Sequence, residues 1–153
     1  PMMPEEKLNF KTLTYEFLQK NISTVIKIGH DIPGEYWKEY HFLMHLPMKF
    51  ELSFVAIDEN GQIIGYAISS MKTKQQVHLH HFIVDHNYRC RGVGSLMIEE
   101  VFRRACAVAS YCSLKVLSQN SRAISLYENY GFVLVGACNS YCSYKKKLTE
   151  GSL

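Results

Sequence analysis

A basic loop with two glycines, residues 89–94 (RCRGVG), lies between a segment typical of a strand and a segment typical of a helix. The N-terminus of a helix presents unpaired N–H groups and a partial positive charge, and both favour a bound phosphate. Gly92 and Gly94 let the backbone approach a ligand closely, and Arg89 and Arg91 can add charge-assisted hydrogen bonds. The loop therefore predicts a site for a phosphate-bearing molecule.

Three kinds of glycine loop compete for this segment. A P-loop ends in Gly-Lys-Ser or Gly-Lys-Thr, which the segment lacks. The dinucleotide fingerprint has a third glycine at the place of Met97, and no early βαβ unit is predicted. A plain turn between strand and helix remains open when the segment is taken alone.

The elements that must position this loop follow from apolar periodicity and turn signals. We expect strands at 8–14, 50–58, 62–71, 76–85, 113–118, 132–137 and 142–148, and helices at 15–28, 35–46, 94–110 and 121–130. The Asn60-Gly61 pair between two apolar runs is a strong hairpin signal. The order is β-α-α-β-β-β-α-β-α-β-β in one domain over residues 1–153. The predicted fold class is α/β, a mixed sheet of about six to seven strands flanked by about four helices.

A second segment, residues 120–132 (NSRAISLYENYGF), resembles the second signature of the GNAT superfamily of N-acetyltransferases, N-x-x-A-x-x-x-Y-x-x-x-G-F. The loop at 89–94 is similar to the first signature, Q/R-x-x-G-x-G. The two motifs stand in the expected order and separation within a matching string of strands and helices. The resemblance implies the GNAT fold, acetyl-CoA as co-substrate and no metal. It also implies acetyl transfer to a primary amine by direct attack in a ternary complex.

The resemblance further implies where the coenzyme binds. Its pyrophosphate would lie on backbone N–H groups of residues 90–95, and its pantetheine arm would pair with the end of the preceding strand. Asn120 would hydrogen-bond the coenzyme, and it also suits the N-cap of the following helix. The expected cofactor-binding residues are Phe82, Ile83, Val84, Arg89, Cys90, Arg91, Gly92, Val93, Gly94, Ser95, Asn120, Ala123 and Tyr127.

Tyr127 matches the family's tyrosine that faces the sulfur of the departing coenzyme, so the resemblance implies a general acid. Tyrosine has a pKa of about 10 and a thiol one of about 8.5, so stabilisation of developing negative charge can matter as much as proton transfer. The alternative is that Tyr127 is a core aromatic on an amphipathic helix.

The strand that enters the loop carries three histidines in four residues. By counting back from Arg89, the counterpart of the glutamate base of GNAT histone acetyltransferases falls at His78. Side chains two apart share a strand face, so His78 and His80 should point together and His81 away, unless a bulge changes the parity. An imidazole with a pKa near 6.5 can accept the proton of the amine, which predicts a rate that rises through pH 6 to 7. The alternative is that these histidines are packed or hydrogen-bonded and that solvent takes the proton.

The acceptor side is less well defined. In this family the region after the first helix usually forms part of that site, and here it holds Glu35, Tyr36 and Trp37. A carboxylate and aromatic rings suit a cationic amine; an amphipathic helix that buries Trp37 is the alternative. Tyr141, in the hairpin at 138–144, is a second candidate. A peptide amine and a small-molecule amine both remain open as acceptors.

Composition narrows the class of protein. The chain has 153 residues, 47% hydrophobic and 20% charged, which is typical of a soluble globular domain. A net charge of +3 falls short of a nucleic-acid footprint, and the lysines at 145–147 fit a solvated strand end. Five cysteines without a Cys-x-x-Cys pair favour reduced thiols. Without a membrane-length apolar run or a signal peptide, a cytoplasmic monomer or homodimer is expected, with neither a membrane nor a nucleic acid as partner.

Two further expectations concern the start of the chain and the class of function. Pro1 before Met2 suggests that the native start is Met2 or Met3, and residues 1–6 are expected to be flexible. A non-catalytic acyl-CoA-binding sensor or interaction module is the alternative to an enzyme. The presence of Tyr127 together with Asn120 favours the enzyme, since a sensor needs a phosphate loop but no acid for a thiolate.

Overall fold

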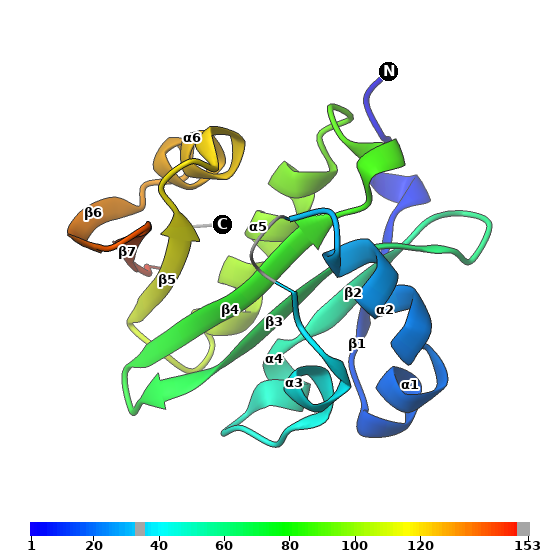
Figure 1. Cartoon of the computed structure of the whole chain (residues 1–153), viewed down its shortest axis with the longest axis horizontal. Coiled ribbons are helices and arrows are strands. Elements are labelled where there is room, and N and C mark those ends of the chain that lie inside the picture. The colour runs from blue at the N-terminus through cyan, green and yellow to red at the C-terminus, as the bar shows by residue number, and fades with distance from the viewer. Residues whose placement is uncertain (33–35, 150–153) are drawn as a thin grey trace.

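The computed structural model describes residues 1–32 and 36–149. These residues form one seven-stranded sheet in the order β1-β2-β3-β4-β5-β7-β6 (Figure 1). The strands are β1 Asn9–Thr12, β2 Phe54–Ile57, β3 Ile63–Thr73, β4 Gln76–Val84, β5 Tyr111–Leu117, β6 Val133–Cys138 and β7 Tyr141–Lys147. All neighbouring strands are antiparallel except β4 and β5. A parallel pair needs a crossover, and the helix α5 provides it.

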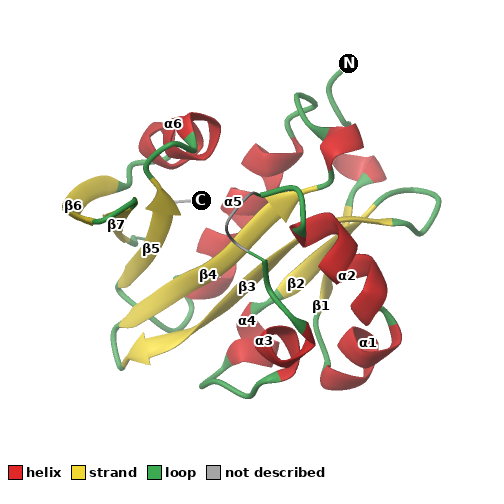
Figure 2. Ribbon diagram, in the orientation of Figure 1, coloured by secondary structure: helices red, strands yellow, loops and turns green. Residues whose placement is uncertain are grey.

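Helices lie on both faces of the sheet, as Figure 2 shows. They are α1 Tyr15–Lys20, α2 Ile22–Gly29, α3 Glu39–Leu43, α4 Lys49–Leu52, α5 Val93–Ala105 and α6 Ser121–Asn129, with 3-10 turns at Glu5–Lys7 and His86–Tyr88. The helices α1 to α3 cover one face of β1 to β4, and α5 covers the other face. In the described part of the chain, no helix is long and apolar enough to cross a membrane.

Each face of the sheet has its own apolar core. Under α1 to α3, the side chains of Leu18, Val25, Phe42 and Tyr66 are fully buried. Around α5, the larger core includes Met97, Phe102 and Leu114 and extends to Tyr127. The predicted class of fold, a mixed sheet between two layers of helices, is therefore confirmed.

Three predicted helices are shorter than expected, and the one expected at 94–110 is α5, which ends at Ala105. The helix expected at 15–28 is two helices, because Asn21 leaves helical geometry and its side-chain amide donates to the Phe17 carbonyl oxygen (2.9 Å). The helix expected at 35–46 is only α3, since Met44 is extended. The strand expected from Phe50 begins later, because residues 49–52 form α4. These changes explain why the described residues hold more helices than predicted.

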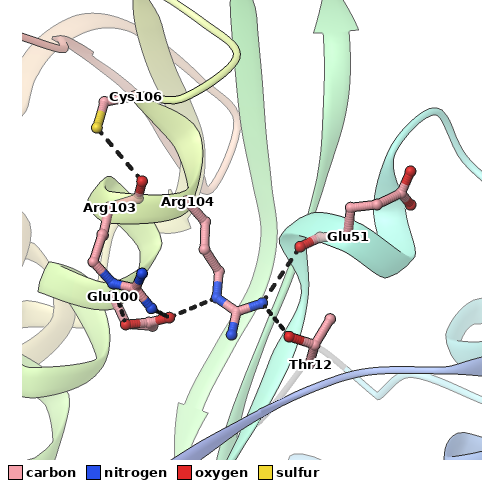
Figure 3. A network of polar contacts seen from close by, with 6 residues as sticks. All are labelled: Thr12, Glu51, Glu100, Arg103, Arg104 and Cys106. Carbon is pink, nitrogen blue, oxygen red and sulfur yellow. Dashed lines mark hydrogen bonds and ion pairs between the residues drawn. The ribbon is translucent and has the colours of Figure 1, made fainter.

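A buried carboxylate fixes α5 against the opposite end of the chain (Figure 3). Glu100 is buried and accepts hydrogen bonds from Arg103 and from Arg104, whose Nε lies 2.7 Å from its Oε2. Arg104 also donates to Thr12 Oγ1 of β1 (2.9 Å) and to the Glu51 carbonyl oxygen of α4 (3.3 Å). A buried charge needs such partners, and these partners hold α5 beside β1 and α4.

Candidate active site

The site is built where the two parallel strands separate. The strands β4 and β5 are paired from Gln76 and Tyr111 to Leu79 and Leu114. Beyond these leucines β4 pairs only with β3 and β5 only with β7, and Figure 1 shows β4 and β5 diverging toward their C-terminal ends. The backbone N–H and C=O groups on the facing edges of β4 and β5 therefore no longer bond to each other there. Because backbone N–H and C=O groups require partners, such an opening is suited to a ligand that carries amides.

A cavity of about 650 Å³ occupies this opening. It is lined by most of the residues predicted to bind the cofactor: Phe82, Ile83, Val84, Arg89, Cys90, Gly92, Val93, Gly94, Ser95, Asn120 and Ala123. Further residues that were not among the expected cofactor-binding residues also line it: Asp31, Ile32, Tyr88, Leu117, Gln119, Ser121, Arg122 and Leu126. Asp31 and Ile32 follow α2 and reach the cavity through tertiary packing alone, so no local signal marks them.

The loop at one end of the cavity has the geometry of an anion site. Cys90 and Gly92 have positive φ angles of 62° and 77°, and α5 begins at Val93. The first N–H that bonds back to the Gly92 carbonyl oxygen belongs to Leu96 (3.2 Å). The N–H groups of residues 93–95 precede it and are left for a ligand by helix geometry. Gly92 has no side chain that could cap them, so the loop fits a phosphate.

Of the two arginines of the loop, Arg89 lines the cavity as expected and Arg91 does not. Arg89 lines the cavity, and its Nη2 lies 3.7 Å from Asp31 Oδ2 while its Nε donates to the Val84 carbonyl oxygen (3.2 Å). Arg91 is not among the lining residues, and its guanidinium lies over the ring of Tyr88.

The N-terminal residues, expected to be flexible, lie against this loop. The Met3 N–H donates to the Arg91 carbonyl oxygen (2.8 Å).

The vertex of the opening holds two of the three predicted catalytic residues, His80 and Tyr127. A small cavity of about 30 Å³ shares Phe82, Asn120 and Ala123 with the large one and adds His80 and Tyr127. Tyr127 is only 6% exposed, and its ring packs against those of Phe82 and Phe132. Asn120 caps α6 by accepting a hydrogen bond from the Ala123 N–H (3.2 Å). The thiol end of a ligand that follows the opening would therefore meet Tyr127 and His80.

A bulge in β4 decides where the histidines point. Ile68 of β3 pairs with His81 and Ser69 with Leu79, so His80 is an extra residue. Before the bulge, Val77 and Leu79 pack into the core around α5; after it, Phe82 packs there.

This bulge brings all three histidines to the face of α1 to α3. The rings of His78 and His80 lie 4.8 Å apart, as expected. His81 would point away only in a regular strand, and here the extra residue reverses the alternation. His81 is 5% exposed, its Nδ1 lies 2.8 Å from the Tyr66 hydroxyl, and its ring stacks with those of Tyr66 and Trp37.

The two candidate bases have different surroundings. His78 lies in the paired part of β4, and its Nδ1 is 2.8 Å from Ser113 Oγ. Burial, and then the charges of His80, Lys72 and Lys115, lower the pKa of His78 to about 4. The ionisation expected for His78 between pH 6 and 7 therefore does not belong to it. His80 lines the small cavity, and its Nε2 lies 2.6 Å from Ser70 Oγ.

Burial also lowers the pKa of His80, with smaller effects from Lys49 and Lys72. Both imidazoles are thus neutral at pH 7 and able to accept a proton. Of the two, His80 is the one that faces the vertex of the opening.

The comparison with protein families decides what this site is. The model of the acetyltransferase (GNAT) family matches residues 22–132 of the chain. The chain belongs to the GNAT family. The match spans α2 to the end of α6, which includes both the phosphate loop and the segment of Asn120 and Tyr127.

Individual relatives agree with this assignment. The GNAT chain is 29% identical over 104 residues to the N-alpha-acetyltransferase daf-31 of Caenorhabditis elegans, covering 64% of this chain and 57% of that protein. It resembles the crystal structure of Ard1 from Thermoplasma volcanium with a TM-score of 0.82 and 22% identity, over 94% of this chain and 99% of that one.

A third relative is a structure with bound ligands. The NatC complex bound to Gag peptide and CoA matches with a TM-score of 0.77 and 20% identity, over 94% of this chain and 99% of the matched chain. The GNAT chain spans little more than half the length of the curated C. elegans relative.

The acceptor-side residues of this GNAT chain are only partly gathered. Trp37 stacks on His81 with ring centroids 4.7 Å apart, whereas Tyr36 is 54% exposed and packs against His30. Glu35 lies outside the described residues. Tyr141 pairs with Leu117 at the end of β5, on β7, and it is not among the residues that line either cavity. The acceptor roles of these residues stay predictions.

Proposed function

We propose that this chain is an acetyl-CoA-dependent N-acetyltransferase that acts on the α-amine of a polypeptide N-terminus. The observation that carries the proposal is the opening between β4 and β5. It has a phosphate-binding loop at one end and Tyr127 with His80 at the other. The names of two relatives support it, an N-alpha-acetyltransferase and a complex bound to a peptide and CoA.

The residues present fit coenzyme A. The pyrophosphate would bind the N–H groups at the start of α5, where the macrodipole favours negative charge. The pantetheine amides would pair with the edge of β4 from His80 to Val84, which β5 leaves unpaired beyond Leu79. Phe82 and Ala123 would line the arm of the coenzyme, since both border the large and the small cavity.

The transfer step needs little more than orientation and two protein groups. The nitrogen of the acceptor attacks the thioester carbon, so that a C–N bond forms and the C–S bond breaks. His80, neutral at pH 7, accepts the proton that the amine loses, directly or through a water. The Tyr127 hydroxyl donates a hydrogen bond or its proton to the departing sulfur, whose negative charge it stabilises. Coenzyme A and the acetylated amine then leave.

The weakness of the base favours an α-amine over a lysine side chain. The pKa of His80 lies below 6.5, the ordinary value for histidine. An α-ammonium group has a pKa of about 8, so proton transfer to such an imidazole costs about 2 kcal/mol or more. A lysine ammonium has a pKa of about 10.4, which raises that cost above about 5 kcal/mol. At neutral pH, an appreciable fraction of α-amines is already free of its proton.

The proposal is tested by thiol release from acetyl-CoA with matched peptides. One peptide has a free N-terminus, and the other is the same peptide with its N-terminus acetylated beforehand. We expect release only with the free N-terminus, even when both peptides contain lysine. Equal release with the blocked peptide would show that the α-amine is not the acceptor.

The cysteines among the described residues are free thiols, which suits the cytoplasmic setting that we propose for this reaction.

A further inference from the structure

The charges on the sheet are distributed unevenly. The five strands β3 to β7, all of which are described, contain no Asp or Glu. The same strands contain the lysines Lys72, Lys115, Lys145, Lys146 and Lys147. The overall charge of +3 conceals this separation, because the acidic residues in the described part of the chain lie in helices and loops instead. This half of the sheet therefore attracts negative charge.

Three of these lysines share the face on which His78 and His80 lie. Leu114 and Val116 point into the core around α5, so Lys115 between them points to the opposite face. Lys145 pairs with Ser113, whose hydroxyl contacts His78 on that same face. The charges of Lys72 and Lys115 both act on His78, which places the two ammonium groups in its neighbourhood.

This face is open beside the vertex. Within the described part of the chain, α1 to α3 lie over β1 to β4 and leave β5 and β7 uncovered on this side (Figure 1). Lys72 and Lys115 are exposed. Lys115 also lines the small cavity together with His80 and Tyr127. Because α5 covers the opposite face, an acceptor that enters the small cavity from the open face passes Lys115.

Two carboxylates near the opening are engaged elsewhere. Asp31 lines the large cavity, and its Oδ2 lies 3.7 Å from Arg89 Nη2. Glu128 accepts a hydrogen bond from the Tyr144 hydroxyl (2.8 Å), and Tyr144 belongs to the core around α5. Neither of them is paired with the lysines of the open face.

Building on the function proposed above, we infer that the acceptor is a polypeptide with acidic residues directly after its N-terminal residue. Lys72, Lys115 and Lys145 would hold these acidic side chains on the open face of β5 and β7. An extended chain advances about 3.3 Å per residue, so the second to fourth residues lie within about 10 Å of the reacting amine. Lys115 lines the small cavity, so it lies within reach of acidic side chains at these positions. Exposed charges closer together than the Debye length, about 8 Å at physiological ionic strength, still attract each other.

The test compares two peptides that differ only in acid and amide groups. One begins Ser-Asp-Glu-Glu and the other Ser-Asn-Gln-Gln, and both continue with the same neutral segment. We expect kcat/KM to be about tenfold higher for the acidic peptide at low salt, as several weak ion pairs would give. The advantage should shrink as salt is added. The double variant Lys72→Glu, Lys115→Glu should lose it, whereas Lys20→Glu on α1, with the same kind of exposed charge reversal, should keep it.

The outcomes separate this inference from the function on which it rests. Equal kcat/KM for the two peptides would overturn the inference and leave N-terminal acetylation standing. If neither peptide is acetylated while acetyl-CoA still stabilises the protein, the proposed function itself fails. A third arm uses a single-stranded RNA oligonucleotide. If RNA binding depends on Lys72 and Lys115 while the peptide preference does not, the open face belongs to nucleic acid and the inference is wrong.

Discussion

Leu79 of β4 and Leu114 of β5 are the last paired residues of the only parallel pair in the described sheet. The next residues, His80 and Lys115, flank the point where the strands separate, and both line the small cavity at that point. A single feature of the sheet thus creates the cavity proposed for the coenzyme, places a neutral imidazole at its vertex and exposes a lysine on the proposed acceptor side.

The first prediction concerns Gly94 and the coenzyme. A Cβ at this position would make ordinary contacts, 3.5 Å from Leu126 Cδ2 and 4.0 Å from Val84 Cγ2, so Gly94→Ala is tolerated by the protein itself. Alanine in the first turn of α5 should stabilise the free protein by up to about 1 kcal/mol. The same methyl group lies in the cavity and should weaken acetyl-CoA binding about tenfold. The thermal midpoint should therefore rise without ligand and respond less to added acetyl-CoA.

The neighbouring glycine is a less selective test. Gly92 has a φ of 77°, and an added Cβ would lie 2.3 Å from Met2 Cε, so any substitution there strains the backbone whatever the ligand does. A Gly94→Ala protein that binds acetyl-CoA as tightly as the wild type would contradict the assignment of the phosphate loop.

A second prediction concerns the hydroxyl of Tyr127. Tyr127→Phe keeps the ring in its contacts with Phe82 and Phe132. We expect kcat to fall on the order of a hundredfold, the lower end of the range for a general acid, while acetyl-CoA affinity changes little. Initial rates at saturating acetyl-CoA measure this. A fully active and folded Tyr127→Phe protein would reduce Tyr127 to a packing residue.

The third prediction separates the two histidines by their pH profiles. The pKa of His78 is lowered to about 4, so this residue stays neutral across the range from pH 5 to 9. The His78→Gln variant should therefore show the wild-type shape of kcat/KM against pH above pH 5. With an α-amine acceptor, kcat/KM should rise toward a pH of about 8 as the substrate loses its proton.

His80→Gln should instead lower kcat/KM about a hundredfold or more at pH 7, because it removes the proton acceptor. Because the pKa of His80 is lowered, the fall in the wild-type pH profile that comes from His80 should lie below pH 6.5. There the imidazole becomes protonated and can no longer accept a proton. Loss of that acidic limb in His80→Gln is the expected signature. A larger loss in His78→Gln than in His80→Gln would reverse the assignment.

The fourth prediction tests the packing behind the histidines. A Cβ on the buried residue Gly29 of α2 would lie 2.6 Å from the Tyr66 hydroxyl and 3.5 Å from His81 Cε1. Tyr66 is fully buried and its hydroxyl is hydrogen-bonded to His81, so Gly29→Ala should lower the free energy of unfolding by about 1 to 3 kcal/mol. Gly136→Ala is the matched control, since nothing lies within 4 Å of its added Cβ. Equal stability of the two variants in urea would refute the tight packing inferred here.

Local sequence signals predicted the parts of the site that depend on neighbouring residues. The phosphate loop precedes a helix that its glycines can begin, and the helix that carries Tyr127 starts at the N-cap residue Asn120. Both could be read from short stretches of sequence. The hairpin at Asn60-Gly61 was equally local, and Gly61 has the positive φ of 80° that such a turn needs.

The remaining parts depend on contacts between distant segments. The bulge at His80 is set by the register of β4 against β3, so the sequence of β4 alone could not show which way His81 points. Asp31 and Ile32 reach the cavity because α2 packs on the sheet. Lys115 is a single exposed lysine between two buried residues, and only the separation of β4 and β5 gives it a place in the site.

The most direct test is to locate the acetyl group on a peptide that has both a free α-amine and a lysine side chain. The peptide is incubated with the protein and acetyl-CoA, and tandem mass spectrometry of the product identifies the modified residue. We predict one acetyl group on the α-nitrogen, formed about a hundredfold more slowly with His80→Gln or Tyr127→Phe protein. Acetylation of the lysine side chain, or α-acetylation that persists unchanged in both variants, would contradict the site and the function proposed for it.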